Sequence, residues 1–146
     1  MKIAIIANTA WYLQNFRLNL ALALREQGHE LVFISPPDRY VAALEAAGFR
    51  HRGWQLASAG TQPLRELASV RQLGRLLREE QVEAVFSYTP KANIYSGLAL
   101  PTGCRLFVPN VSGLGRAFVQ PSWVTPIVKQ LYRLAFRRAH RVVFQN

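Results

Sequence analysis

The chain has 146 residues, half of them apolar, so it can bury one sizeable hydrophobic core. Charged residues make up 18% of it, and glycine and proline are scattered, which excludes a disordered or linker-rich protein. The apolar run after Lys2 is only strand-length, so we expect neither a signal peptide nor a membrane span there. Cys104, the single cysteine, is expected to be a buried structural thiol in a reducing compartment. These features predict one domain over residues 1–146.

The net charge of +10 is unevenly distributed. Residues 1–83 contain ten Lys/Arg and eight acids, a net charge of +2, whereas residues 84–146 contain eight Lys/Arg and no acid, a net charge of +8. A cationic region without internal neutralisation favours a polyanion, an anionic membrane or a phosphate-bearing ligand. A solvated surface without a specific partner is the alternative.

Short apolar runs alternate with segments of helical periodicity. In chain order, the pattern predicts a strand at 2–7, a helix at 15–27, a strand at 30–35, a helix at 38–47, a weaker strand at 49–56, a long helix at 63–80, a strand at 82–86, a helix at 92–99, a strand at 105–108, a helix at 121–139 and a strand at 141–144. Six strands alternating with helices predict an α/β fold, a doubly wound Rossmann-like sandwich with a mostly parallel sheet.

Two loops that follow predicted buried strands carry polar chemistry. Residues 87–97 read Ser-Tyr-Thr-Pro-Lys-Ala-Asn-Ile-Tyr-Ser-Gly, and residues 110–116 read Asn-Val-Ser-Gly-Leu-Gly-Arg. In an open parallel sheet, loops at the carboxyl ends of strands form the ligand crevice. These loops hold hydroxyls, amides, glycines and cations but no carboxylate, which favours an anionic or sugar-like ligand.

Individual residues in these loops suit such a ligand. Lys91, near a helix start, could place an ammonium and free backbone N–H groups on a diphosphate. Gly113 and Gly115 would let a ligand approach the backbone, with Ser112 and Arg116 on either side. A solvated lysine and an ordinary glycine-rich turn are the alternatives. Near the first strand, Asn15 suits a helix cap as well as a ligand contact.

The sequence gives little support for a dinucleotide, P-loop or metal site. Residues 8–13 contain no glycine, so the first strand lacks the Gly-x-Gly-x-x-Gly turn of a dinucleotide site, and the chain has no P-loop. His29, His51 and His140 have no partner at metal-ligand spacing and are expected to be structural or surface residues. We therefore expect neither a metal nor a cofactor.

Several segments, taken in order, resemble a known family. They are residues 1–4 (Met-Lys-Ile-Ala), 15–17 (Asn-Phe-Arg), 28–30 (Gly-His-Glu), 87–95, 111–115 (Val-Ser-Gly-Leu-Gly) and 142–146 (Val-Val-Phe-Gln-Asn). Over essentially its whole length the chain resembles the amino-terminal half of retaining GT-B glycosyltransferases. It is most similar to those that build bacterial O-antigen, capsular and glycoprotein glycans on undecaprenyl diphosphate.

The resemblance implies that this domain binds the acceptor, a lipid-linked saccharide. A carboxyl-terminal domain, absent from this chain, would bind the nucleotide-sugar donor and supply the paired glutamates of a Glu-x7-Glu motif. No fitting Glu-x7-Glu occurs here, so we expect no catalytic residue in this chain and no activity from it alone. The resemblance also implies a role in lipopolysaccharide or capsule biosynthesis, and a cytoplasmic protein peripheral to the inner face of the cytoplasmic membrane.

The candidate acceptor-binding residues are Asn8, Thr9, Asn15, Arg17, Tyr88, Thr89, Lys91, Asn93, Ser112, Gly113, Gly115 and Arg116. Ser112 departs from the family, in which many members have a histidine at this position. A serine can donate a hydrogen bond to a sugar hydroxyl or phosphate but is no proton acceptor near neutral pH without a partner base. A retaining transfer tolerates this change, because the departing phosphate oxygen can take the acceptor proton.

The helix predicted over 121–139 is amphipathic. The buried arc is expected to hold Trp123, Val124, Ile127, Val128, Leu131, Leu134 and Ala135. The opposite arc is expected to face an anionic membrane surface with Lys129, Tyr132, Arg133, Phe136 and Arg137. Packing of the two aromatic residues on the second domain is the alternative.

Two other functions compete with the acceptor-binding domain. The first is a non-catalytic module that binds a nucleotide or sugar phosphate in the basic crevice. The second is an RNA-binding protein, which the high isoelectric point permits. RNA binding would favour aromatic residues interleaved with basic ones, but most aromatic residues here fall in apolar patterns, so we expect no nucleic-acid partner.

Overall fold

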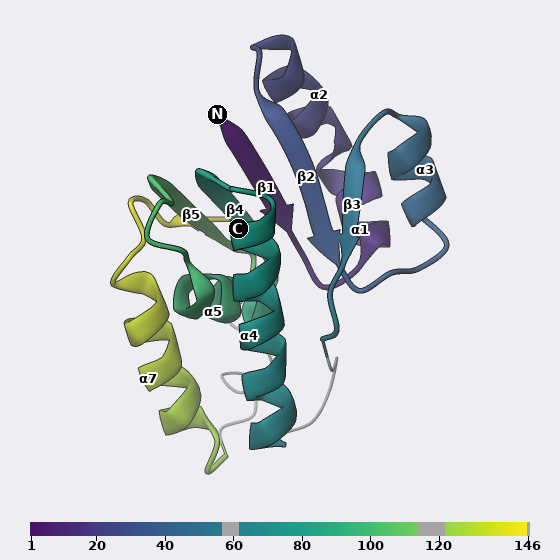
Figure 1. Cartoon of the computed structure of the whole chain (residues 1–146). Helices are drawn as coiled ribbons and strands as arrows, with labels where there is room; N and C mark the ends of the chain where they lie inside the picture. Colours follow the sequence, from purple (N-terminus) through teal and green to yellow (C-terminus); the bar gives the residue numbers. More distant parts are fainter. Residues whose placement is uncertain (57–61, 114–121, 146) are drawn as a thin grey trace.

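The computed structural model describes residues 1–56, 62–113 and 122–145 (Figure 1). Its centre is a six-stranded sheet in the order β3-β2-β1-β4-β5-β6, and every pair of neighbouring strands is parallel. The strands are β1 (Lys2–Ile6), β2 (Glu30–Ser35), β3 (Arg50–Gly53), β4 (Ala84–Tyr88), β5 (Leu106–Val111) and β6 (Val143–Phe144). The predicted fold class is confirmed. The strand order reverses between β1 and β4, and such switch points are where open α/β sheets bind ligands.

Helices cover both faces of the sheet (Figure 1). They are α1 (Ala10–Phe16), α2 (Leu18–Glu26), α3 (Val41–Ala46), α4 (Pro63–Glu79), α5 (Pro90–Ala99) and α7 (Thr125–Phe136). One hydrophobic cluster joins the sheet to α1, α2 and α3, and a second joins it to α4, α5 and α7. The central strands β1 and β2 are buried on both faces of the sheet. This explains why apolar and polar residues do not alternate in their sequences.

The first helical region begins earlier than predicted and is interrupted. Thr9 is the N-cap of α1, with its Oγ1 accepting a hydrogen bond from the Tyr12 N–H at 3.0 Å, and Arg17 separates α1 from α2. Asn15 therefore lies inside α1, where its Nδ2 donates to the Trp11 carbonyl at 2.8 Å. The expectation that Asn15 caps the helix was wrong, because Thr9 takes the cap position six residues earlier. A contact between Asn15 and the acceptor stays a prediction.

Other boundaries also differ from the prediction. α3 begins at Val41, three residues after the predicted helix start at Asp38. The Asp38 carboxylate accepts hydrogen bonds from the backbone N–H groups of Tyr40 and Trp11. β5 continues through Val111, so part of the second predicted loop is strand. α7 begins at Thr125, because residues 122–124 form a turn in which the Ser122 N–H donates to Thr125 Oγ1 at 3.0 Å.

Helix α5 lies between α4 and α7 and is buried over most of its length. Its Gly97 allows the closest approach, since a Cβ there would lie 2.5 Å from the Ala135 carbonyl oxygen of α7. This contact turns Tyr132 and Ala135 inward, against α5. The close approach of the α7 backbone to Gly97 therefore determines which face of α7 is buried. The apolar periodicity of α7 alone does not indicate this face.

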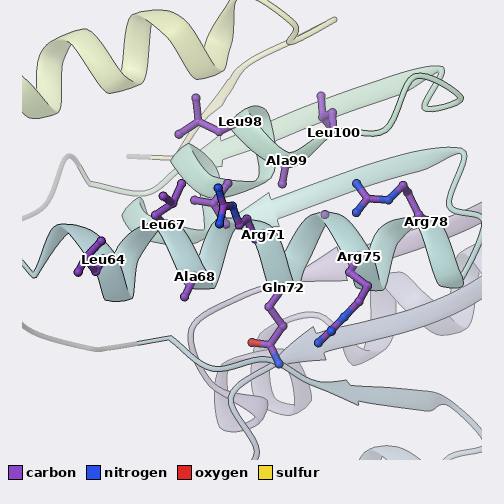
Figure 2. Close-up of a pocket in the computed structure, with 12 residues that line it drawn as sticks. Leu64, Leu67, Ala68, Arg71, Gln72, Arg75, Arg78, Leu98, Ala99 and Leu100 are labelled. Atoms are coloured by element: carbon purple, nitrogen blue, oxygen red, sulfur yellow. The ribbon is translucent and has the colours of Figure 1, made fainter.

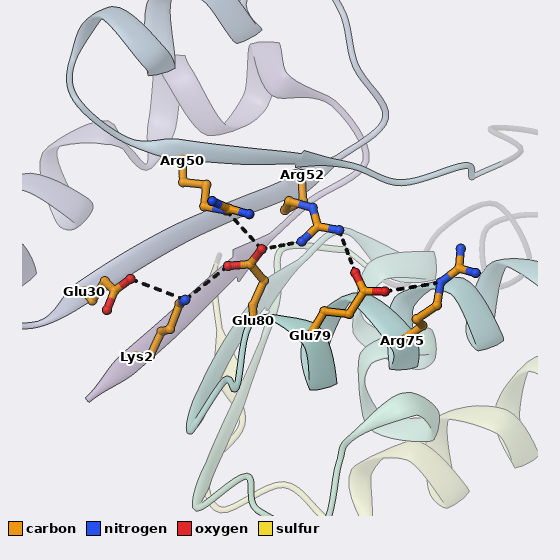
Figure 3. Close-up of polar contacts among 7 residues, drawn as sticks. All are labelled: Lys2, Glu30, Arg50, Arg52, Arg75, Glu79 and Glu80. Atoms are coloured by element: carbon orange, nitrogen blue, oxygen red, sulfur yellow. Dashed lines mark hydrogen bonds and ion pairs between the residues drawn. The ribbon is translucent and has the colours of Figure 1, made fainter.

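An ion-pair network ties the amino-terminal edge of the sheet together (Figure 3). Glu80, at the end of α4, is 3% exposed and pairs with Lys2 of β1 and with Arg50 and Arg52 of β3. Burial alone would raise the pKa of Glu80, but hydrogen bonds from Arg52 and Lys2, and the charges of Lys2 and Arg50, hold it below its ordinary value. The network lies at the amino ends of the strands, opposite the carboxyl edge, and is structural.

Candidate functional site

The carboxyl ends of β1 and β4 bring the first candidate residues together. Asn8 and Thr9 follow β1, and Tyr88 ends β4 next to it. Thr89, the one residue between β4 and α5, has φ = 77° and ψ = 148°. A β-branched residue adopts this region only under strain of about 1–3 kcal/mol, and such strain gathers at ligand sites. The predicted loop after β4 is thus a single strained residue that leads directly into a helix N-terminus.

Arg17 lies against the ring of Tyr88. Its guanidinium carbon is 3.9 Å from the centre of the Tyr88 ring and 5.4 Å from that of Tyr12. One nitrogen, Nη2, donates to Tyr12 Oη at 2.8 Å and to Gln145 Oε1 at 3.2 Å. Burial raises the pKa of the Tyr88 hydroxyl, and the Arg17 charge partly opposes this rise. Arg17, Tyr88 and Thr89, all predicted site residues, lie in one constellation.

Lys91 lies in the first turn of α5 but is paired with a carboxylate. Its Nζ is 2.9 Å from Oε1 of Glu66 on α4, and the other Glu66 oxygen accepts from Tyr95 Oη. Burial, with the Glu66 contact as a further cause, raises the pKa of Tyr95 well above its ordinary value. The two predicted loops contain no carboxylate, but α4 brings Glu66, which lies 25 residues earlier in the sequence, to Lys91.

Asn93 has a structural role in this arrangement. It is 1% exposed, accepts from Ser87 Oγ at 2.7 Å and donates to the Asn110 carbonyl at 2.8 Å. These bonds tie α5 to the ends of β4 and β5. Both polar atoms of its amide have partners within the protein, so Asn93 supports the loop from beneath. A direct contact between Asn93 and a ligand stays a prediction.

Two of the predicted residues follow the end of β5. Ser112 and Gly113 are exposed, and a Cβ placed on Gly113 would meet no atom within 4 Å. Packing within the described residues therefore does not require a glycine at position 113. Gly115 and Arg116, the remaining predicted residues of this loop, lie outside the described residues.

The exposed face of α7 is not the predicted one. Tyr132, expected at a membrane surface, is 7% exposed, and its burial raises its pKa to about 12. Phe136 packs beside it, with ring centres 5.2 Å apart. Three residues expected in the core, Trp123, Ile127 and Leu134, are instead 74%, 50% and 50% exposed. Lys129, Arg133 and Arg137 are exposed, as expected.

A groove of about 730 Å³ runs along α4 beside the end of α5 (Figure 2). Its apolar lining includes Leu64, Leu67 and Leu98, and its cations are Arg71, Arg75 and Arg78. Leu64 is 83% exposed. Sequence reasoning missed this groove, although arginines at helical spacing beside exposed leucines were a signal for it.

The histidines make structural contacts. His51 Nε2 is 2.9 Å from Ser35 Oγ, and His140 Nδ1 accepts from the Phe107 N–H of β5. Among the described residues, no group of three or more His, Cys, Asp or Glu could hold a metal ion, and no helix there is long and apolar enough to cross a membrane.

Comparison with known proteins bears on the fold and the family of the chain. A curated relative from Campylobacter jejuni, N,N'-diacetylbacillosaminyl-diphospho-undecaprenol alpha-1,3-N-acetylgalactosaminyltransferase, is 24% identical over the whole chain, which spans 40% of that protein. Among solved structures, Anabaena Alr3699/HepE in complex with UDP matches 97% of the chain with a TM-score of 0.66 at 16% identity. Acinetobacter baumannii MurG matches 98% with a TM-score of 0.64 at 11% identity. The chain covers 37% and 40% of these two proteins, and the fold is one half of the GT-B arrangement. Residues 13–146 match the glycosyl transferase 4-like domain, and the chain belongs to this family.

Proposed function

We propose that this chain is the acceptor-binding part of a retaining glycosyltransferase that transfers a sugar from a nucleotide-sugar to a polyprenyl-diphosphate-linked saccharide. The observation that carries the proposal is the constellation at the switch point. Arg17, Thr89 and the N-terminus of α5 meet there, next to the end of β5. Donors at such an edge suit phosphate and sugar oxygens.

The donor side of the reaction is assigned to a second domain. The chain spans about 40% of the curated relative, and its sequence has no Glu-x7-Glu. The relatives whose names and titles mention UDP or an undecaprenol-linked sugar support a nucleotide-sugar donor and a lipid-linked acceptor. A polyprenyl acceptor would also give the apolar and cationic surfaces of α4 and α7 a use at the inner membrane face.

A binding experiment tests the assignment. The purified chain should bind undecaprenyl-diphosphate-linked N-acetylglucosamine in nanodiscs saturably and more tightly than it binds UDP-N-acetylglucosamine. It should form no product when both are present, because its sequence has no Glu-x7-Glu to act on the donor. Tighter binding of the nucleotide-sugar would favour a nucleotide-binding module, and turnover by the chain would contradict the division of labour.

Substitutions in the Glu66–Lys91 ion pair test the role of Lys91 more directly. Glu66→Gln keeps an acceptor for Tyr95 but removes the charge that compensates Lys91, so affinity for the lipid-linked diphosphate should rise by about 1 kcal/mol. Lys91→Ala should lower it by about 1–3 kcal/mol. Glu45→Gln, on an exposed position of α3, changes the net charge equally and serves as the control. Equal affinities for all four proteins would remove Lys91 from the binding site.

A further inference from the structure

Helix α1 carries two large aromatic side chains that the fold does not bury. Trp11 is 45% exposed and Phe16 is 54% exposed. Their rings meet edge to face, with centres 5.5 Å apart at 85°. Tyr12 lies 5.2 Å from Phe16 and 6.0 Å from Tyr88, measured between ring centres. Trp11, Phe16, Tyr12 and Tyr88 therefore form a continuous aromatic row that runs from the surface to the end of β4.

The aromatic row is held in place before any ligand binds. Thr9 caps α1, and the Trp11 N–H donates to Asp38 Oδ2 at 3.0 Å, which ties the first turn of α1 to the loop after β2. Arg17 packs on Tyr88 and hydrogen-bonds Tyr12 Oη. A surface fixed in this way loses little conformational entropy when a ligand settles on it.

Polar atoms that lack partners lie at the inner end of the row. Within the described part of the chain, Arg17 Nε and Thr89 Oγ1 are buried and have no hydrogen-bond partner. Buried polar atoms are nearly always satisfied, so a ligand that brings hydroxyl groups would complete this corner. An aromatic surface next to hydrogen-bonding groups matches a pyranose ring, which has a C–H face and a rim of hydroxyls.

We propose that the aromatic row is a saccharide subsite, in which a pyranose ring of the acceptor packs on Trp11 and Phe16 and directs hydroxyls toward Arg17 and Thr89. The inference rests on the proposed function only in that a saccharide must reach this edge of the sheet. Two exposed rings are too small for a stable protein interface, which buries roughly 1,000 Å² or more. The exposed cations of α4 and α7, which an anionic membrane would contact, lie with the helices of the other sheet face.

Saturation-transfer NMR with a lipid-free sugar tests the subsite separately from the lipid and the donor. The chain would be mixed with millimolar N,N'-diacetylchitobiose, and we expect transfer to the ring C–H protons of the sugar. Trp11→Ala combined with Phe16→Ala should reduce the transfer at least fivefold. Trp123→Ala removes an equally aromatic, 74% exposed residue from the other sheet face and should leave the transfer unchanged.

The double variant could misfold, and circular dichroism would reveal this. The single variant Trp11→Leu keeps an apolar side chain and therefore provides a second test. It should also lose most of the transfer, since a leucine offers no aromatic face. Wild-type-like transfer in a folded Trp11→Leu protein, or no transfer in the wild type, would overturn the subsite. If the wild-type chain gives the chitobiose signal but does not bind the lipid-linked acceptor, the result would count against the polyprenyl proposal alone.

Discussion

Glu80 is the most buried carboxylate of the described residues, and its three cationic partners come from two strands. Removal of one member of such a cluster leaves the other buried charges without compensation. The resulting loss of folding free energy is larger than the net stabilisation that the ion pairs provide. The pKa of Glu80 lies below its ordinary value, so its ionised form stabilises the folded state. This stabilisation is complete above the unfolded-state pKa, near 4.5, and is lost as the pH falls through the folded-state pKa.

Glu80→Gln should therefore lower the free energy of unfolding by about 3 kcal/mol at pH 7, and the difference from wild type should shrink below pH 4.5. Urea unfolding at pH 7, 4.5 and 3 measures both effects. Glu79→Gln is the control, because Glu79 is 47% exposed and its pairs are worth at most about 1 kcal/mol. A Glu80→Gln deficit that stays constant down to pH 3 would argue against the ion-pair explanation.

The positions of some side chains could be predicted from the sequence, and those of others could not. Tyr88 ends β4 and Thr89 follows it, so both lie at the carboxyl edge of the sheet, as expected for residues at the end of a buried parallel strand. Their contact with an acceptor stays a prediction. The pairing of Lys91 with Glu66 and the burial of Asn93 were not foreseen. Both depend on which helix packs next to α5, and that information lies in the tertiary structure rather than in the local pattern.

At the scale of elements, strands were predicted better than helix faces. β2 has its predicted bounds, because its apolar run ends at two consecutive prolines. The predicted orientation of α7 was wrong, because the close approach of Ala135 to Gly97 turns Tyr132 and Ala135 toward α5. Ile127 and Leu134 of α7, and Trp123 in the turn before it, remain exposed.

The α5–α7 contact predicts the effect of one added methyl group. In Gly97→Ala the new Cβ would lie 2.5 Å from the Ala135 carbonyl oxygen and 2.7 Å from the Ala135 Cβ, so the two helices would have to separate. We expect a loss of about 3 kcal/mol in the free energy of unfolding, at the upper end for overpacking. Gly103→Ala, where a Cβ meets nothing within 4 Å, should change it by less than about 0.5 kcal/mol. Chemical denaturation of both variants gives the comparison, and equal midpoints would mean that α5 and α7 are not closely packed.

Over the whole molecule, different surfaces have different chemistry. The carboxyl edge of the sheet holds the candidate site, and the amino edge is closed by ion pairs. The helical layer of α4, α5 and α7 combines exposed apolar residues, among them Leu64 and Trp123, with exposed arginines. Such a combination suits an anionic bilayer, in which apolar side chains enter the interface and cations meet the lipid headgroups. The membrane role proposed for α7 thus keeps its cations but exchanges Tyr132 and Phe136 for Trp123, Ile127 and Leu134.

Liposome co-sedimentation tests this surface. The chain should bind vesicles that contain anionic phospholipid, and binding should fall as salt increases, because the attraction is screened. Each cation near the surface contributes about 1 kcal/mol, so Arg133→Gln with Arg137→Gln should weaken binding by about 30-fold at low salt. The matched control is Arg39→Gln with Arg105→Gln, which removes the same charge from exposed positions outside this layer. Equal loss in the two double variants would mean that net charge alone governs binding, and no loss in either would contradict a membrane-facing α7.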